Sequence, residues 1–118
     1  MEQIYNKLVR DKIPEIIKNN GEEPIIEILN DIEYKKELEK KLYEEYLEVI
    51  ESNGINRLEE LADMLEVMKS LAQLENKELK DIIDIANKKM QKEVLLTRKY
   101  ILKKLYQTNK IIIIIIFF

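Results

Sequence analysis

The chain has 118 residues and a mass of 14.2 kDa, which is the size of one ordinary domain. Charged residues make up 36% of it and there are only two glycines and two prolines, so the composition favours long helices with charged outer faces over a turn-rich β protein. With a formal net charge of -3, no cysteine and no histidine, the sequence excludes disulfides, a thiol nucleophile and a histidine base, and it argues against binding nucleic-acid polymers through a basic surface.

The residue types that remain restrict both the chemistry and the location. Catalysis or binding must use carboxylates, lysines, hydroxyls and cations held by oxygen atoms. The first residues contain no apolar core of the length that a signal peptide needs, so we expect a cytoplasmic protein. The apolar run at residues 111–118 is far shorter than the ~20 residues that span a bilayer, so a membrane protein is not expected.

The first predicted helix covers Leu8–Lys18. Pro14 lies either inside the first turns of this helix or at its true beginning, because proline is tolerated only near a helix start. Residues 19–21, with the sequence Asn-Asn-Gly, are predicted to end it. Residues 22–30 include Pro24 and are predicted to form a connector.

Two long helices follow the connector. Asp31 is the predicted cap of a helix over Ile32–Glu51, which the Ser-Asn-Gly sequence at residues 52–54 ends. Asn56 is the predicted cap of a third helix over Arg57–Leu74. A connection of about five residues between these helices favours antiparallel neighbours, so their facing surfaces are where we expect a functional site.

A fourth helix is predicted from Glu78 to at least Met90, after a break at residues 75–77. The predicted fold class is therefore all-α, a bundle of about four helices with its site between two antiparallel helices.

Acidic side chains fall within the apolar faces of the second and third helices. At about 100° per residue, Glu45 projects inside the apolar stripe of the second helix and Glu48 lies on the flank of that stripe. On the third helix, Glu60 projects within the apolar surface and Asp63 lies at its edge. The apolar residues that define these two faces are Leu38, Leu42, Tyr46 and Val49, and Leu58, Leu61, Met64, Leu65, Val67, Met68, Leu71 and Leu74.

This arrangement of acids predicts a metal site. Residues at i and i+3 share a helix face, so Glu45 with Glu48 and Glu60 with Asp63 can converge across an antiparallel pair. Four converging carboxylates need a compensating cation. Magnesium suits oxygen ligands and nucleotide chemistry, and manganese can replace it. The alternative interpretation is chance, because an acid-rich helix contains many such pairs.

Other side chains of these helices are expected to have structural roles. The acids that point away from the apolar faces are expected to be solvated surface: Glu39, Glu51, Glu59 and Glu66. The methionines and tyrosines are expected to pack in the core or at its rim rather than to stack on a base: Met64, Met68, Tyr43 and Tyr46.

Two segments carry a family resemblance. Residues 41–48, with the sequence KLYEEYLE, and residues 59–67, with the sequence EELADMLEV, resemble the paired Glu-Glu-x-x-Glu and Glu-x-x-Asp signature of MazG-like and phosphoribosyl-ATP pyrophosphohydrolases. The opening Tyr5–Pro14, YNKLVRDKIP, resembles the start of one MazG-like branch. The resemblance covers residues 4–92, and it implies a MazG-type helical domain over residues 1–92 that forms a homodimer or a higher homo-oligomer.

The resemblance also implies an activity, the hydrolysis of nucleoside triphosphates between the α and β phosphates to a monophosphate and pyrophosphate, which removes unwanted nucleotides from the pool. Glu45, Glu48, Glu60 and Asp63 would hold magnesium, and one of them or Glu44 would orient the attacking water. Two alternatives stay open: the same chemistry on phosphoribosyl-ATP in histidine biosynthesis, and a non-enzymatic helical interaction module.

Basic residues are the candidates for contacts with phosphate, because ammonium and guanidinium groups offset the charge of phosphate oxygens. The first candidates are Lys7, Arg10 and Lys12, and further candidates are Lys41, Lys89 and Lys92. Ordinary surface charge is the alternative interpretation for all of them.

The sequence after Lys92 departs from this branch, whose members continue with a Lys-Arg-Gly-x-Phe segment. We interpret residues 93–118 as an aberrant C-terminal helix and apolar tail. We hypothesise that a shift of reading frame produced them. If residues 92–101 are encoded by A+T-rich codons, a neighbouring frame can read Arg-Gly-Ser-Phe-Asp-Lys-Lys-Val-Tyr, which is close to the ending of this MazG-like branch. The gene sequence tests this hypothesis. The charge-free run at residues 111–118 is typical of an aggregating segment, with membrane anchoring as the alternative.

Overall fold

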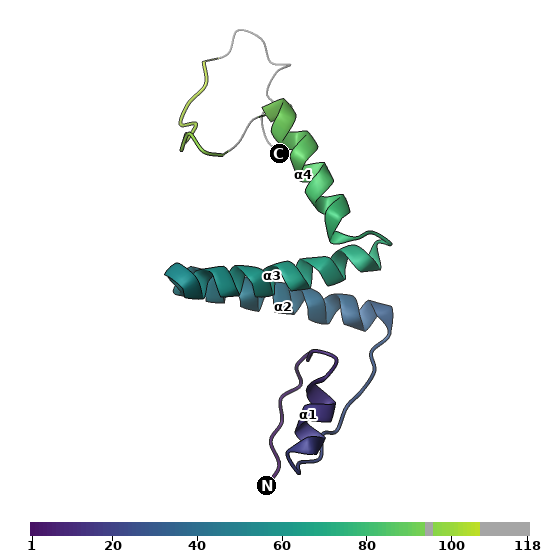
Figure 1. Cartoon of the computed structure of the whole chain (residues 1–118). Helices are drawn as coiled ribbons and strands as arrows, with labels where there is room; N and C mark the ends of the chain where they lie inside the picture. Colours follow the sequence, from purple (N-terminus) through teal and green to yellow (C-terminus); the bar gives the residue numbers. More distant parts are fainter. Residues whose placement is uncertain (94–95, 107–118) are drawn as a thin grey trace. The chain divides into compact units, whose positions relative to one another are not determined.

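The computed structural model describes residues 1–93 and 96–106, with the side chains of residues 90–93 left aside. Within these residues there are four helices and no strand, which confirms the all-α fold class (Figure 1). The helices are α1 (Ile13–Asn19), α2 (Asp31–Glu51), α3 (Gly54–Leu74) and α4 (Leu79–Glu93). No helix in this part of the chain is both long enough and apolar enough to cross a membrane.

The chain divides into two compact units, Met1–Ile85 and Ala86–Phe118. The division falls inside α4, and the first unit contains all the acids of the predicted site. In the second unit, residues 96–106 form a turn followed by irregular chain, so they contain no further helix. The apolar run at residues 111–118 lies outside the described residues, and the predicted boundary after residue 92 stays a prediction.

Helix α1 begins at Ile13 and not at Leu8, so the second of the two expected positions of Pro14, at the true beginning of the helix, is confirmed. Proline is preorganised for the first turn of a helix, where its missing N–H has no partner to lose. The helix ends at Asn19, one residue after the predicted end at Lys18 and within the predicted Asn-Asn-Gly stop. Gly21 follows with φ 83, a left-handed conformation that glycine adopts without steric cost.

Helix α2 is capped by Asn30, and not by Asp31 as predicted. The side-chain oxygen of Asn30 accepts a hydrogen bond of 2.9 Å from the backbone N–H of Glu33. Asp31 becomes the first residue of the helix, where a negative charge interacts favourably with the helix dipole. The end of α2 at Glu51 agrees with the prediction.

Residues 52–53 alone join α2 to α3, because α3 begins at Gly54 and not at Arg57. The predicted cap at Asn56 is therefore wrong, and Asn56 lies in the first turn of α3. Gly54 has φ 58, which allows the chain to reverse within a very short connection. As expected, α2 and α3 are antiparallel neighbours that pack side by side (Figure 1).

The break between α3 and α4 is close to the predicted one. Asn76 has φ 59, and the backbone N–H of Lys77 donates to the carbonyl oxygen of Ala72 at 3.0 Å. Helix α4 starts at Leu79, and the side chain of Asp81 accepts a hydrogen bond of 2.8 Å from the backbone N–H of Glu78.

The core of the α2–α3 hairpin is small. Among the described residues, only three hydrophobic side chains are buried: Leu38, Val67 and Ala72. Many large apolar side chains of the same two helices are exposed, namely Tyr43, Tyr46, Leu47, Ile50, Ile55, Leu58, Leu61 and Leu65. An exposed apolar surface on this scale is typical of a site of protein association.

We predict that Asn30→Ala lowers the free energy of unfolding by about 1 kcal/mol, because the mutation leaves the N–H of Glu33 without its cap. The measurement is urea denaturation followed by circular dichroism. Asn53→Ala is the matched control, because Asn53 caps α3 without a side-chain hydrogen bond and its loss should cost less. Equal effects of the two mutations would contradict the capping role of Asn30.

Candidate metal centre

Glu45 is the buried charged residue of the described chain. Glu45 lies on the same face of α2 as Leu38, about two helical turns further along. Its exposed fraction is 5%. One carboxylate oxygen, Oε1, lies 3.6 Å from Nζ of Lys41, and the other, Oε2, has no hydrogen-bond partner among the described residues. A buried carboxylate oxygen without a partner is costly, so this atom points to a missing cation or proton.

Helix α3 contributes Glu60 and Asp63, which share one face because they are three residues apart. Ligand oxygens of Glu45, Glu60 and Asp63 all lie within 4.8 Å of one another. Glu60 is half-buried, and its Oε2 also has no hydrogen-bond partner within the described part of the chain. The fold thus brings together three of the four acids that the sequence proposed as ligands.

The fourth acid, Glu48, is exposed and lies beside the group rather than within it. It still affects its neighbours. The neighbouring carboxyl group of Glu48, followed by burial and by the charges of Glu48, Asp63 and Glu45, raises the pKa of Glu60 from 4.5 to about 7. The pKa of Glu45 is raised mainly by burial and then by Glu48, whereas Lys41 acts in the opposite direction.

The three clustered acids fit a hard cation. Magnesium binds oxygen ligands at about 2.1 Å, so opposite ligands lie on the order of 4 Å apart, close to the observed spread of the three oxygens. The cluster offers oxygen donors only, which suits magnesium or manganese and not a metal that prefers nitrogen or sulfur. The two unpartnered oxygens, on Glu45 and Glu60, are the ones for which a cation would provide the missing partner.

Two cationic side chains contact this acidic cluster. Nη2 of Arg10 donates to Oδ1 of Asp63 at 2.9 Å, an ion pair that joins residues 53 positions apart in the chain. Nζ of Lys41 lies 3.6 Å from Glu45 and 3.9 Å from Glu44. Arg10 and Lys41 were both predicted phosphate contacts, and the fold places them at the acids.

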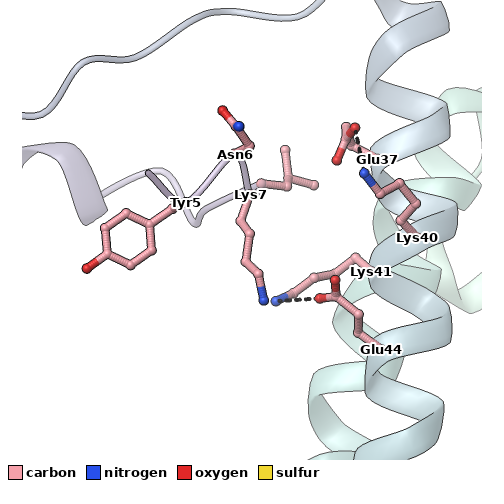
Figure 2. Close-up of a pocket in the computed structure, with 8 residues that line it drawn as sticks. Tyr5, Asn6, Lys7, Glu37, Lys40, Lys41 and Glu44 are labelled. Atoms are coloured by element: carbon pink, nitrogen blue, oxygen red, sulfur yellow. Dashed lines mark hydrogen bonds and ion pairs between the residues drawn. The ribbon is translucent and has the colours of Figure 1, made fainter. Parts of the chain in front are cut away.

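The remaining predicted phosphate contacts have different positions. Lys7 lines a cavity beside α2, together with Lys41 and Glu44 (Figure 2). Lys12 is exposed just before α1, and no ion pair of it is found within the described residues. Lys89 belongs to the second unit, and the side chain of Lys92 lies outside the described residues.

The acids expected to be solvated surface are all exposed: Glu39, Glu51, Glu59 and Glu66. Met64 and Met68 are half-buried, as core or rim residues should be. Tyr43 and Tyr46 are exposed at the rim, with their ring centres 6.1 Å apart. The helical period therefore distinguished inward acids from outward acids correctly, and Glu48 lies at the flank of the apolar face.

Sequence reasoning missed two charged residues of the cavity wall, Glu37 and Lys40. A signal for them exists, because Glu37 precedes Lys41 by four residues and Glu44 by seven, so these side chains share one face of α2. The pairing of Arg10 with Asp63 had no such signal, because it joins a segment outside the helices to α3.

Comparisons with known proteins give one short similarity. The chain is 49% identical over 43 residues to an uncharacterized protein of Mycolicibacterium smegmatis (strain ATCC 700084 / mc(2)155). This match covers 36% of the chain and 44% of that protein, so the chain spans less than half the length of this relative. No protein-family profile and no solved structure matches the chain.

We predict that wild-type protein loses stability, relative to Glu60→Gln, as the pH rises from 4.5 to about 7. Because the folded state raises the pKa of Glu60, it binds a proton that the unfolded state has lost in this range, and this contribution disappears above the folded pKa. The measurement is the free energy of unfolding against pH without divalent cations. Glu59→Gln, which changes an exposed neighbour, should give the same pH dependence as wild type. Parallel curves for wild type and Glu60→Gln would contradict the raised pKa of Glu60.

Proposed function

We propose that this protein is a magnesium-dependent pyrophosphohydrolase of nucleoside triphosphates. The observation that carries the proposal is the cluster of Glu45, Glu60 and Asp63, whose oxygens lie within 4.8 Å of one another on two facing helices. The buried oxygens without partners on Glu45 and Glu60 support a cation at this point. The resemblance to MazG-like pyrophosphohydrolases supplies the reaction, and manganese is expected to replace magnesium.

The acidic cluster and its neighbours have the residue types that this reaction needs. A bound magnesium ion would supply positive charge to the phosphate oxygens and would polarise a water molecule. One carboxylate of the cluster, or the half-buried Glu44 next to Glu45, would orient the attacking water. That water forms a bond to phosphorus and gives up its proton to a carboxylate, while the bond between the α and β phosphates breaks and pyrophosphate leaves.

Cationic side chains next to the acids complete the proposed site. Arg10 and Lys41 already contact Asp63 and Glu45, so they lie close to where phosphate groups on a shared cation would be. A guanidinium and an ammonium group stabilise negative charge on phosphate oxygens. We place this reaction in the cytoplasm, where nucleoside triphosphates are made and used.

A second copy of the chain is the proposed partner. The α2–α3 hairpin buries few hydrophobic side chains, and a core of this size is small for a stable domain. Leu61 and Leu65 of α3 are at least 40% exposed, as are Leu47 and Ile50 of α2. Pairing of two hairpins would cover these side chains and give the homo-oligomer that the family resemblance implies.

We predict magnesium-dependent release of pyrophosphate from nucleoside triphosphates by the full chain. Glu60→Gln and Asp63→Asn should each lower the rate by about 100-fold or more, because each removes a charged ligand of the cation. The measurement is coupled detection of pyrophosphate with a panel of canonical and modified nucleotides and phosphoribosyl-ATP. Glu59→Gln and Glu66→Gln remove the same charge from exposed positions of α3 and should keep the wild-type rate.

Thermal unfolding with and without magnesium separates the enzyme from a non-enzymatic interaction module. A cation that binds only the folded state adds about 2.7 kcal/mol of stability at 100 times its dissociation constant. Stabilisation of wild type that is lost in Glu60→Gln supports the metal site. No stabilisation, together with no hydrolysis of any nucleotide, would refute the proposed function and favour the interaction module.

We predict that Leu61→Glu and Leu65→Glu convert the homo-oligomer to monomers, because a buried and unpaired carboxylate opposes association. The measurement is sedimentation equilibrium of the full chain over a range of concentrations. Lys69→Glu introduces the same residue at an exposed polar position of α3 and should leave the assembly unchanged. A wild-type protein that stays monomeric at every concentration would contradict the proposed pairing.

A further inference from the structure

We infer that the cavity beside α2 binds the terminal phosphates of the substrate, the part that leaves as pyrophosphate. This inference rests on the proposed function and assigns a separate subsite to it. The cavity has a volume of about 160 Å³ and lies between the N-terminal segment and α2 (Figure 2). Its lining consists of Tyr5, Asn6, Lys7, Leu8, Glu37, Lys40, Lys41 and Glu44.

The cavity wall carries a cationic side chain without an anionic partner. Lys40 pairs with Glu37 at 3.4 Å, and Lys41 lies 3.9 Å from Glu44. Within residues 1–93 and 96–106, the structure gives Lys7 no ion pair. In Figure 2 the side chains of Lys7 and Lys41 point toward one another, although two ammonium groups repel. An anion between them would remove this repulsion.

Lys41 connects the cavity to the acidic cluster. Its side chain lines the cavity, and its Nζ also lies 3.6 Å from Oε1 of Glu45. A chain of phosphate groups that begins at a cation held by Glu45 can therefore reach the lysines without leaving the protein surface. Positive charge from Lys7 and Lys41 would then act on the phosphates that depart from the reaction.

The size and polarity of the cavity favour phosphate over a nucleoside. Its volume of about 160 Å³ is roughly ten times the ~15 Å³ that one water molecule needs, so it can admit a small anion. Base-binding pockets are larger and mainly apolar, at about 300 Å³ or more, whereas five of the eight lining residues here are charged. The cavity therefore suits phosphate groups rather than a nucleoside.

The N-terminal segment is positioned for this role by local and distant contacts. Asn6 has φ 46, so the chain turns sharply where Lys7 enters the cavity wall. Leu8 is half-buried, and the ion pair of Arg10 with Asp63 at 2.9 Å ties the segment to α3. Lys7 thus belongs to a segment that contacts Asp63 of the acidic cluster through Arg10.

The test is isothermal titration of the full chain with inorganic pyrophosphate in the presence of magnesium. We expect Lys7→Gln to weaken pyrophosphate binding by about tenfold or more, because it removes a charged donor from the anion. Binding of magnesium alone should not change. Lys36→Gln is the matched control, because Lys36 is an exposed lysine of α2 that does not line the cavity, and this variant should bind pyrophosphate like wild type.

Steady-state kinetics then separate this inference from the proposed function. If wild type hydrolyses nucleoside triphosphates and Lys7→Gln raises KM and the inhibition constant of pyrophosphate together, the subsite is supported. If Lys7→Gln leaves both constants and pyrophosphate binding unchanged while wild type is active, the subsite is wrong and the proposed function stands. If wild type releases no pyrophosphate but still binds it through Lys7, the proposed function fails and the anion site stands.

Discussion

Glu45 lies 5% exposed in the interface between α2 and α3, although the surrounding face of α2 is apolar. A carboxylate in such a place is costly unless a partner compensates its charge. Lys41 compensates part of it, but Oε2 of Glu45 has no partner in the described chain, and two acids of α3 add more negative charge nearby. The hairpin therefore requires a proton or a cation at this point. The packing of α2 against α3 therefore has a chemical consequence, because it brings the carboxylates of Glu45, Glu60 and Asp63 together.

The geometry of this contact depends on a very short connection. Residues 52–53 and the left-handed Gly54 place α3 directly against α2, so acids that are distant in sequence meet across the pair. A hairpin of two helices has little core of its own, and only Leu38, Val67 and Ala72 are buried hydrophobic residues in the described chain. Each of two paired helices can bury only one face against the other. A second copy of the chain would cover the apolar surface that remains exposed.

Opposite charges are arranged side by side around the proposed site. Three carboxylates of the two long helices form one cluster. The N-terminal segment brings Arg10 to Asp63 and places Lys7 in the wall of the cavity beside α2. This pattern suits a substrate that combines a cation with several phosphates, because the cation needs the acids and the phosphate oxygens need the bases. The similarity to the uncharacterized Mycolicibacterium smegmatis protein covers 36% of the chain and names no activity. The proposed function therefore depends on this arrangement of charges and on the resemblance to MazG-like pyrophosphohydrolases.

The sequence by itself determined the helical class, the two long helices and the inward direction of Glu45, because helical periodicity is a local property that 3.6 residues per turn make visible. It also predicted the exposed acids correctly. Only the tertiary structure decided where α3 begins, that Glu48 lies outside the cluster, that Arg10 pairs with Asp63 and that Lys7 lines a cavity with Lys41. These features depend on a backbone reversal at Gly54 and on contacts between segments far apart in the chain, and no periodicity within one helix records such contacts.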